Sequence, residues 1–92
     1  MTNYKVLLSV TARTQLKRLP DKLQKRIKKA LSELGTDPYK PRPKCDIKKI
    51  KGPKRYYYRL RVGNYRAIYV VENKKVKVAK ILPRSKAYDW IE

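Results

Sequence analysis

Residues 56–71 read YYYRLRVGNYRAIYVV, a pattern typical of a β-hairpin. Apolar and polar side chains alternate along 56–62, which predicts a strand with one face toward a core. Gly63-Asn64 favours a two-residue turn. Residues 65–71 are almost all apolar, as in a strand covered on both faces. We therefore predict an antiparallel hairpin whose second strand lies inside a sheet.

A two-residue turn would also bring three arginines together. It places Arg61 directly across from Arg66, with Arg59 on the same face as Arg61. Like charges that face each other destabilise a sheet, so we expect an anion between Arg61 and Arg66. Two alternatives remain: a one-residue register shift, or Arg59 and Arg61 as the ordinary polar face of a strand. Arg66 interrupts an apolar strand and therefore needs a partner or a function.

Periodicity and turn residues predict the remaining elements of the chain. They are a strand at 4–8, a helix from Thr11 (its N-cap) to Pro20, a helix from Asp21 to Gly35 opened by a capping box of Asp21 and Gln24, a proline-rich loop at 36–44, a strand at 75–82 and a short C-terminal segment at 84–92. Residues 47–51 alternate only weakly before Gly52-Pro53. The order β-α-α-β-β-β predicts one α+β domain over residues 1–92, with an antiparallel sheet packed against two N-terminal helices.

Composition narrows the class of protein. The chain has 92 residues, 26 Lys and Arg, seven Asp and Glu and no His, giving a formal charge of +19. At 41% hydrophobic residues it can build a core, so it is not a disordered basic tail. It lacks the roughly 20 consecutive apolar residues of a membrane span and shows no evident signal peptide, so we expect a cytoplasmic protein. One cysteine and no His argue against a disulfide framework, a metal site or a cofactor.

The charge is concentrated in the middle of the chain. Residues 39–66 contain eleven Lys and Arg and a single acidic residue, Asp46. Tyrosines are interleaved with these cations, a combination that suits RNA, because cations bind phosphates while aromatic rings stack on bases. A basic thermophile surface would carry matching Glu, which is scarce here. Candidate RNA-binding residues are Lys48, Lys49, Lys51, Lys54, Arg55 and Lys86.

RNA cleavage is a reaction that Arg, Lys and Tyr could support without His. The 2′-OH of RNA can attack the adjacent phosphate without a metal, given a base, cations for the charged transition state and an acid for the leaving oxygen. Arg84, Lys86 and Tyr88 follow the last strand and could reach the arginine face. Tyr88 could equally pack in the core beside Trp90.

Three segments resemble a known family: DIKKIKG at 46–52, YYRLRVGNYRAIY at 57–69 and LPRSKAY at 82–88. Together they are similar to the RelE/ParE toxin superfamily, and most similar to its archaeal RelE branch. The resemblance implies the toxin of a type II toxin–antitoxin pair, which cleaves mRNA in the ribosomal A site by the 2′-OH route. It also implies a RelB-like antitoxin that wraps the basic surface with amphipathic helices.

The resemblance assigns site residues by position. It implies catalytic roles for Arg59, Arg61, Arg66, Arg84 and Tyr88, with Lys86 as the alternative to Arg84 and Lys51 matching the basic residue before the glycine. Relatives often have lysines at the two strand positions. Because arginine does not lose its proton in proteins, the role of base shifts to Tyr88 or to a lysine, and the choice between them stays open. Two other functions remain open: a ParE-like inhibitor of DNA gyrase, and a noncatalytic RNA-binding relative.

Overall fold

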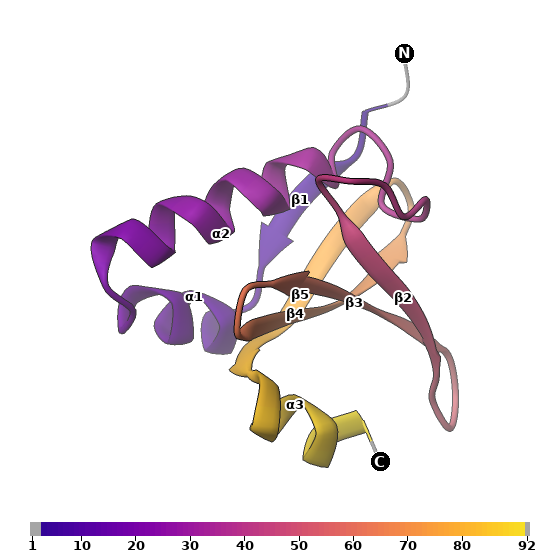
Figure 1. Ribbon diagram of the computed structural model, residues 1–92. Helices are drawn as coiled ribbons and strands as arrows, with labels where there is room; N and C mark the ends of the chain where they lie inside the picture. Colours follow the sequence, from indigo (N-terminus) through magenta and orange to yellow (C-terminus); the bar gives the residue numbers. More distant parts are fainter. Residues whose placement is uncertain (1–2, 92) are drawn as a thin grey trace.

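The computed structural model describes the backbone of residues 3–91 and the side chains up to residue 87. Five strands form one mixed sheet in the order β1-β5-β4-β3-β2, with β1 parallel to β5 and the other pairs antiparallel (Figure 1). The elements are β1 (Lys5–Leu8), α1 (Val10–Lys17), α2 (Asp21–Glu33), β2 (Asp46–Lys51), β3 (Tyr56–Val62), β4 (Tyr65–Glu72), β5 (Lys75–Pro83) and α3 (Arg84–Ile91). The α+β class is confirmed.

The predicted hairpin is present with the predicted register. Val62 pairs with Tyr65 and Arg61 pairs with Arg66. Gly63 has a φ of 59°, a left-handed conformation that glycine adopts without steric cost. β4 is the central strand, and residues 66–70 are all buried. The short-range pattern therefore predicted both the turn and the place of β4 in the sheet.

Three features differ from the predicted topology. Residues 46–51 form an edge strand, β2, whose weak alternation reflects a single buried side chain, that of Ile47. The parallel pairing of β1 with β5 makes the sheet mixed rather than wholly antiparallel. The C-terminal segment is a helix, α3, which follows directly after Pro83 at the end of β5.

The helix starts also differ from the prediction. Ser9, not Thr11, caps α1: its extended backbone lets the hydroxyl accept a hydrogen bond from the Ala12 N–H at 2.9 Å. The predicted capping box of α2 is wrong, because Pro20 occupies the N-cap position and makes no side-chain hydrogen bond. The Gln24 amide instead donates to the carbonyl of Leu19 at 2.7 Å.

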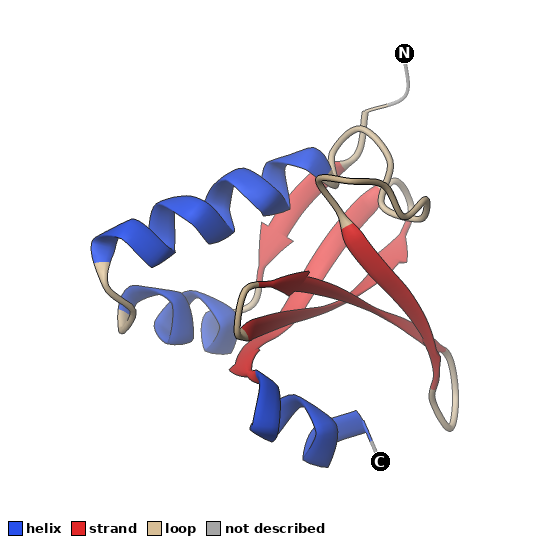
Figure 2. Ribbon diagram, viewed as in Figure 1, coloured by secondary structure: helices blue, strands red, loops and turns tan. Residues whose placement is uncertain are grey.

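Helices α1 and α2 cover one face of the sheet and form the core with it (Figure 2). The fully buried Tyr69 hydroxyl donates to the carbonyl of Pro38 at 2.7 Å and so fastens the proline-rich loop to the sheet. Arg42 fastens the same loop to α2 by donating to the Glu33 carbonyl, and its backbone exchanges two hydrogen bonds with the buried Cys45. No helix in the described part of the chain is long and apolar enough to cross a membrane.

Candidate nucleic-acid interface

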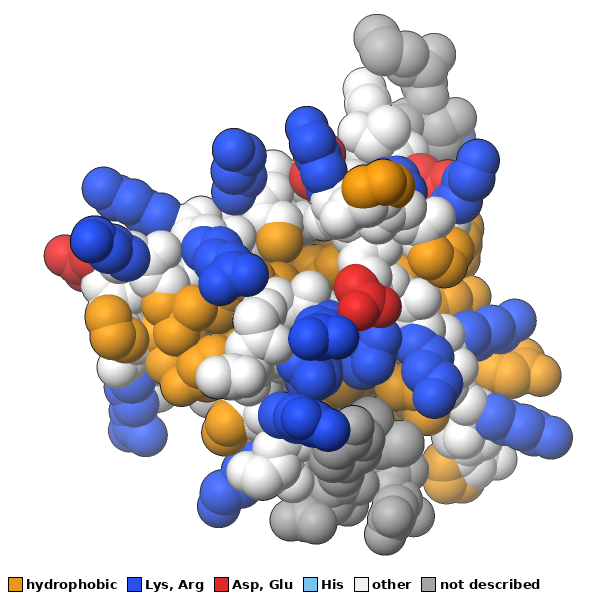
Figure 3. Space-filling view, in the orientation of Figure 1, with side chains coloured by type: hydrophobic (Ala, Val, Ile, Leu, Met, Phe, Trp, Pro, Cys, Tyr) orange, Lys and Arg blue, Asp and Glu red, His pale blue; other side chains and the backbone are white. Residues whose placement is uncertain are grey.

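The sheet face opposite α1 and α2 carries the predicted arginines in two adjacent rows. One row crosses four strands as Asp46, Arg61, Arg66 and Leu82, and the next as Lys48, Arg59, Ile68 and Lys80. Figure 3 shows Lys and Arg side chains gathered near the centre of the molecular face and spread along α2. The fold therefore gathers residues from β2, β3, β4 and β5 into one basic surface, which we call the arginine face.

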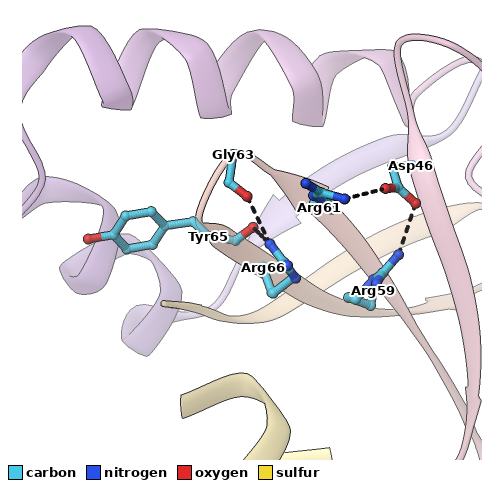
Figure 4. Close-up of polar contacts among 6 residues, drawn as sticks. All are labelled: Asp46, Arg59, Arg61, Gly63, Tyr65 and Arg66. Carbon is cyan, nitrogen blue, oxygen red and sulfur yellow. Dashed lines mark hydrogen bonds and ion pairs between the residues drawn. The ribbon is translucent and has the colours of Figure 1, made fainter. Parts of the chain in front are cut away.

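An anion does contact these arginines, and it belongs to the chain itself. The Asp46 carboxylate lies 2.9 Å from the Arg59 guanidinium and 3.7 Å from that of Arg61 (Figure 4). The Arg59 side chain is 18% exposed and that of Arg61 is 56% exposed. Arg59 Nε is buried and has no hydrogen-bond partner in the described part of the protein. Arg61 therefore remains open to a ligand, whereas Arg59 is largely enclosed.

Arg66 is the buried cation of the cluster. Its Nη1 donates to the carbonyl oxygens of Gly63 and Tyr65, each at 3.0 Å (Figure 4). These bonds supply partners that a buried guanidinium requires, and they stabilise the hairpin turn. The expectation that Arg61 and Arg66 share an anion stays a prediction, since the carboxylate described above contacts Arg61 and Arg59.

Lys80 also belongs to the arginine face, although the sequence pattern of residues 75–82 did not predict it. Strict alternation would put Lys80 on the core side with Val78. A β-bulge intervenes: Ile68 pairs with Lys80 but Tyr69 pairs with Val78, which leaves Ala79 as the extra residue. After the bulge, side chains of β5 point to the opposite sheet face from the one that strict alternation predicts. Ile81 is therefore buried in the core, and Lys80 lies on the arginine face. The apolar residues of 78–81 do not alternate regularly with polar ones, and this break in alternation was the sequence signal for the bulge.

The C-terminal candidates lie on α3, at the hairpin end of the sheet. The Arg84 N–H donates to the Asn64 carbonyl at 2.8 Å, which fixes the start of α3 beside the hairpin turn. Arg84 and Lys86 are exposed. Tyr88 follows Arg84 by about one helical turn, but its side chain lies outside the side chains that the structure describes.

The other predicted RNA-binding residues separate into two groups. Lys48 joins the arginine face opposite Arg59. The rest lie elsewhere: Lys49 rests over the Tyr56 ring at 4.0 Å, Lys51 ends β2, Lys54 lies in the following turn and Arg55 pairs with Glu72 at 3.2 Å. At about 3.3 Å per residue, Arg55 is roughly 20 Å from Arg61 along β3. These four residues are therefore not part of the arginine face.

The arrangement suits electrostatic stabilisation of a phosphate. Arginine provides fixed donors for phosphate oxygens but does not act as a base, so proton transfer needs another group. The described side chains contain no group of three or more His, Cys, Asp or Glu that could hold a metal ion. The described side chains of the site therefore act mainly through their positive charge.

Known proteins with similar sequences and structures show which family this chain resembles. A family model described as the ParE toxin of the type II toxin–antitoxin system parDE matches residues 6–88. Toxin RelE3 of Methanocaldococcus jannaschii is 40% identical over 86 residues, which cover 94% of this chain and 97% of that protein. A second protein of that organism, putative toxin RelE1, is 39% identical over 79% of this chain and 81% of its own length.

Solved structures agree with the sequence matches. The archaeal RelE–RelB complex from Pyrococcus horikoshii contains a chain with a TM-score of 0.78 and 34% identity, covering 94% of this chain and 99% of that one. The RelB–RelE antitoxin–toxin complex from Methanococcus jannaschii contains one with a TM-score of 0.70 and 36% identity, with the same coverage.

Proposed function

This chain belongs to the RelE/ParE superfamily of type II toxins, and from that premise we propose that it is a metal-independent endoribonuclease that cuts mRNA on the ribosome. In this reaction the 2′-OH attacks the adjacent phosphorus, the bond to the 5′-oxygen breaks, and a 2′,3′-cyclic phosphate forms. The proton of the 2′-OH passes to a base, and the leaving oxygen takes up a proton. The alignment of Arg59, Arg61 and Arg66 across β3 and β4 is the observation that carries the proposal.

Each residue receives a distinct role in this proposal. The half-exposed Arg61 binds a non-bridging oxygen of the scissile phosphate, and Arg59 supports it from the enclosed side. Arg66 holds the hairpin turn and adds positive potential beneath the phosphate. Arg84, at the start of α3, stabilises the leaving oxygen, and Tyr88 serves as the base.

The proposed partners are mRNA and the rRNA of the ribosomal A site. A small basic domain carries enough positive charge to enter an RNA-lined site, with a strong dependence on salt. We also propose a RelB-like antitoxin, because the two similar archaeal toxins were solved in complexes with RelB. With these partners, the proposed location is the cytoplasm. The proposal includes no membrane contact, metal or cofactor.

Toeprinting on translating ribosomes tests this function. The wild-type protein should cut within the A-site codon, and Arg61→Ala or Arg84→Ala should abolish the cuts. Arg13→Ala, an exposed arginine of α1 outside the arginine face, is the matched control and should keep them. Growth arrest with intact mRNA and a supercoiling defect would instead indicate a gyrase inhibitor. No toxicity and no cleavage would indicate a noncatalytic relative.

A further inference from the structure

A groove of about 370 Å³ lies between α2, the loop before β2, and the end of β3. Its walls carry four cations and two carboxylates: Arg26, Lys29, Lys44, Arg61, Glu33 and Asp46. Its apolar lining comes from Ala30, Pro43 and Val62. This volume falls in the range of small-ligand pockets, roughly 300–1,000 Å³, and is large enough for a nucleotide-sized group.

Three of the four cations have no partner among the side chains that the structure describes. The side-chain nitrogens of Arg26, Lys29 and Lys44 make neither a hydrogen bond nor an ion pair with a described residue. The Arg26 guanidinium lies over the hairpin turn, 3.1 Å from the position that a Cβ on Gly63 would occupy. Unpaired cations around a concave surface focus positive potential and attract phosphate.

The groove is continuous with the arginine face through Arg61, which belongs to both. An RNA strand with one phosphate at Arg61 would therefore place a neighbouring nucleotide in the groove. A protein helix fits less well. Docking such a helix requires a broad apolar surface, whereas Val62 is only 6% exposed and the rim is charged.

The two carboxylates distinguish this groove from a simple phosphate site. The whole chain has seven acidic residues, and two of them line this groove. A carboxylate repels phosphate but accepts hydrogen bonds from base amino groups. Asp46 already contacts Arg59 and Arg61, whereas Glu33 has no side-chain partner among the described residues. The Glu33 carboxylate is therefore available as an acceptor.

We propose that this groove binds the base of the nucleotide next to the scissile phosphate, with Arg26 on its phosphate and Glu33 accepting a hydrogen bond from its amino group. The inference rests on the proposed function, since it assumes an RNA ligand. Cytosine has an amino group where uracil has a carbonyl oxygen, and the two bases have the same size. The groove should therefore prefer cytosine to uracil.

Equilibrium binding to short 2′-O-methyl RNA separates this inference from the cleavage reaction, because the methyl group blocks the attacking oxygen. The full chain is titrated with oligocytidine and oligouridine at about 100 mM salt. Wild type should bind oligocytidine about tenfold more tightly, the discrimination expected of one hydrogen bond to a charged group. Glu33→Met should remove the preference, and Glu33→Gln, which keeps an acceptor oxygen, should restore part of it.

Arg26→Ala should weaken binding to both oligonucleotides about equally. Lys28→Ala, an exposed cation of α2 that does not line the groove, is the control and should change affinity less than Arg26→Ala. Thermal unfolding checks that every variant folds. An unchanged preference in Glu33→Met, or equal effects of Arg26→Ala and Lys28→Ala, would overturn the groove assignment. The assignment would also be overturned if these variants left RNA binding unchanged but weakened the binding of a RelB-like antitoxin. A wild-type protein that binds neither RNA would overturn the proposed function as well.

Discussion

Asp46 lies directly opposite Arg61 on neighbouring strands, and its carboxylate contacts the Arg61 guanidinium at 3.7 Å while bonding Arg59 at 2.9 Å. It is the only acidic residue among residues 39–66. Its oxygens approach the arginines as those of a bound phosphate would. The carboxylate and an RNA phosphate should therefore compete for Arg61.

Asp46→Asn should strengthen RNA binding by removing this competitor. The slope of log affinity against log salt should steepen by up to about 0.7, the value for one more phosphate contact on a single strand. Titration of 2′-O-methyl RNA at several salt concentrations measures it. Asp21→Asn, at the exposed start of α2, is the charge-matched control. Weaker binding by Asp46→Asn would mean that the carboxylate positions the arginines rather than competing for them.

Arg66 should matter for folding more than Arg61 does. Arg66→Met removes the donor to two carbonyls at the hairpin turn and should lower the free energy of unfolding by about 1–3 kcal/mol. Arg61→Met loses only a long, exposed ion pair and should cost less than about 1 kcal/mol. Urea denaturation measures both. Equal losses would contradict the structural role assigned to Arg66.

Tyr69→Phe should release the proline-rich loop from the sheet. The substitution keeps the ring but leaves the Pro38 carbonyl without its donor at 2.7 Å, which should cost about 1–3 kcal/mol. Hydrogen exchange of the loop 36–45 should quicken in parallel. Tyr56→Phe, at a half-exposed ring, is the control and should change stability little. Identical effects of the two substitutions would contradict the anchoring role.

The same residue should impose an alkaline limit on stability. Burial raises the pKa of Tyr69 well above its ordinary value. Above about pH 10 the unfolded chain loses this proton while the native state keeps it, so native stability falls as the pH rises. The stability difference between wild type and Tyr69→Phe should therefore shrink from pH 9 to about pH 11. Denaturation curves at each pH measure it, and a constant difference would refute the linkage.

Ser9→Ala should destabilise the protein by about 1 kcal/mol through loss of the α1 cap. The effect should exceed that of an exposed substitution, because the Ser9 hydroxyl also donates to the Ala79 carbonyl at 2.7 Å. Thr11→Ala, two residues on, should be nearly neutral. Thermal unfolding of the pair decides between the two residues as the N-cap, and a larger loss for Thr11→Ala would contradict the structure.

The elements that were predicted correctly depend on neighbours in sequence. The hairpin register followed from Gly63-Asn64 and from alternation within β3, both local properties. The cap at Ser9 was missed because several hydroxyls near a helix start can serve, and only backbone geometry selects one. β2 was missed because an edge strand buries few side chains and so shows weak periodicity.

The parts of the site that escaped prediction depend on distant pairing. Lys80 reaches the arginine face through a bulge whose position depends on the match between β4 and β5. The contact of Asp46 with Arg59 exists only once β2 pairs with β3. The facing of Arg61 and Arg66, by contrast, required only the turn between them. Residue types and local spacing predicted the arginines, whereas the pairing of distant strands determined which other residues lie beside them.

The burial of Cys45 supplies a built-in probe of local motion. The chain has one thiol, it is fully buried, and its desolvation raises its pKa above the ordinary value. A thiol reagent can modify it only when the loop before β2 leaves the sheet. One wall of the groove comes from this loop. The rate of thiol modification therefore reports the free energy of opening that wall, without any substitution in the chain. Bound RNA should slow the modification.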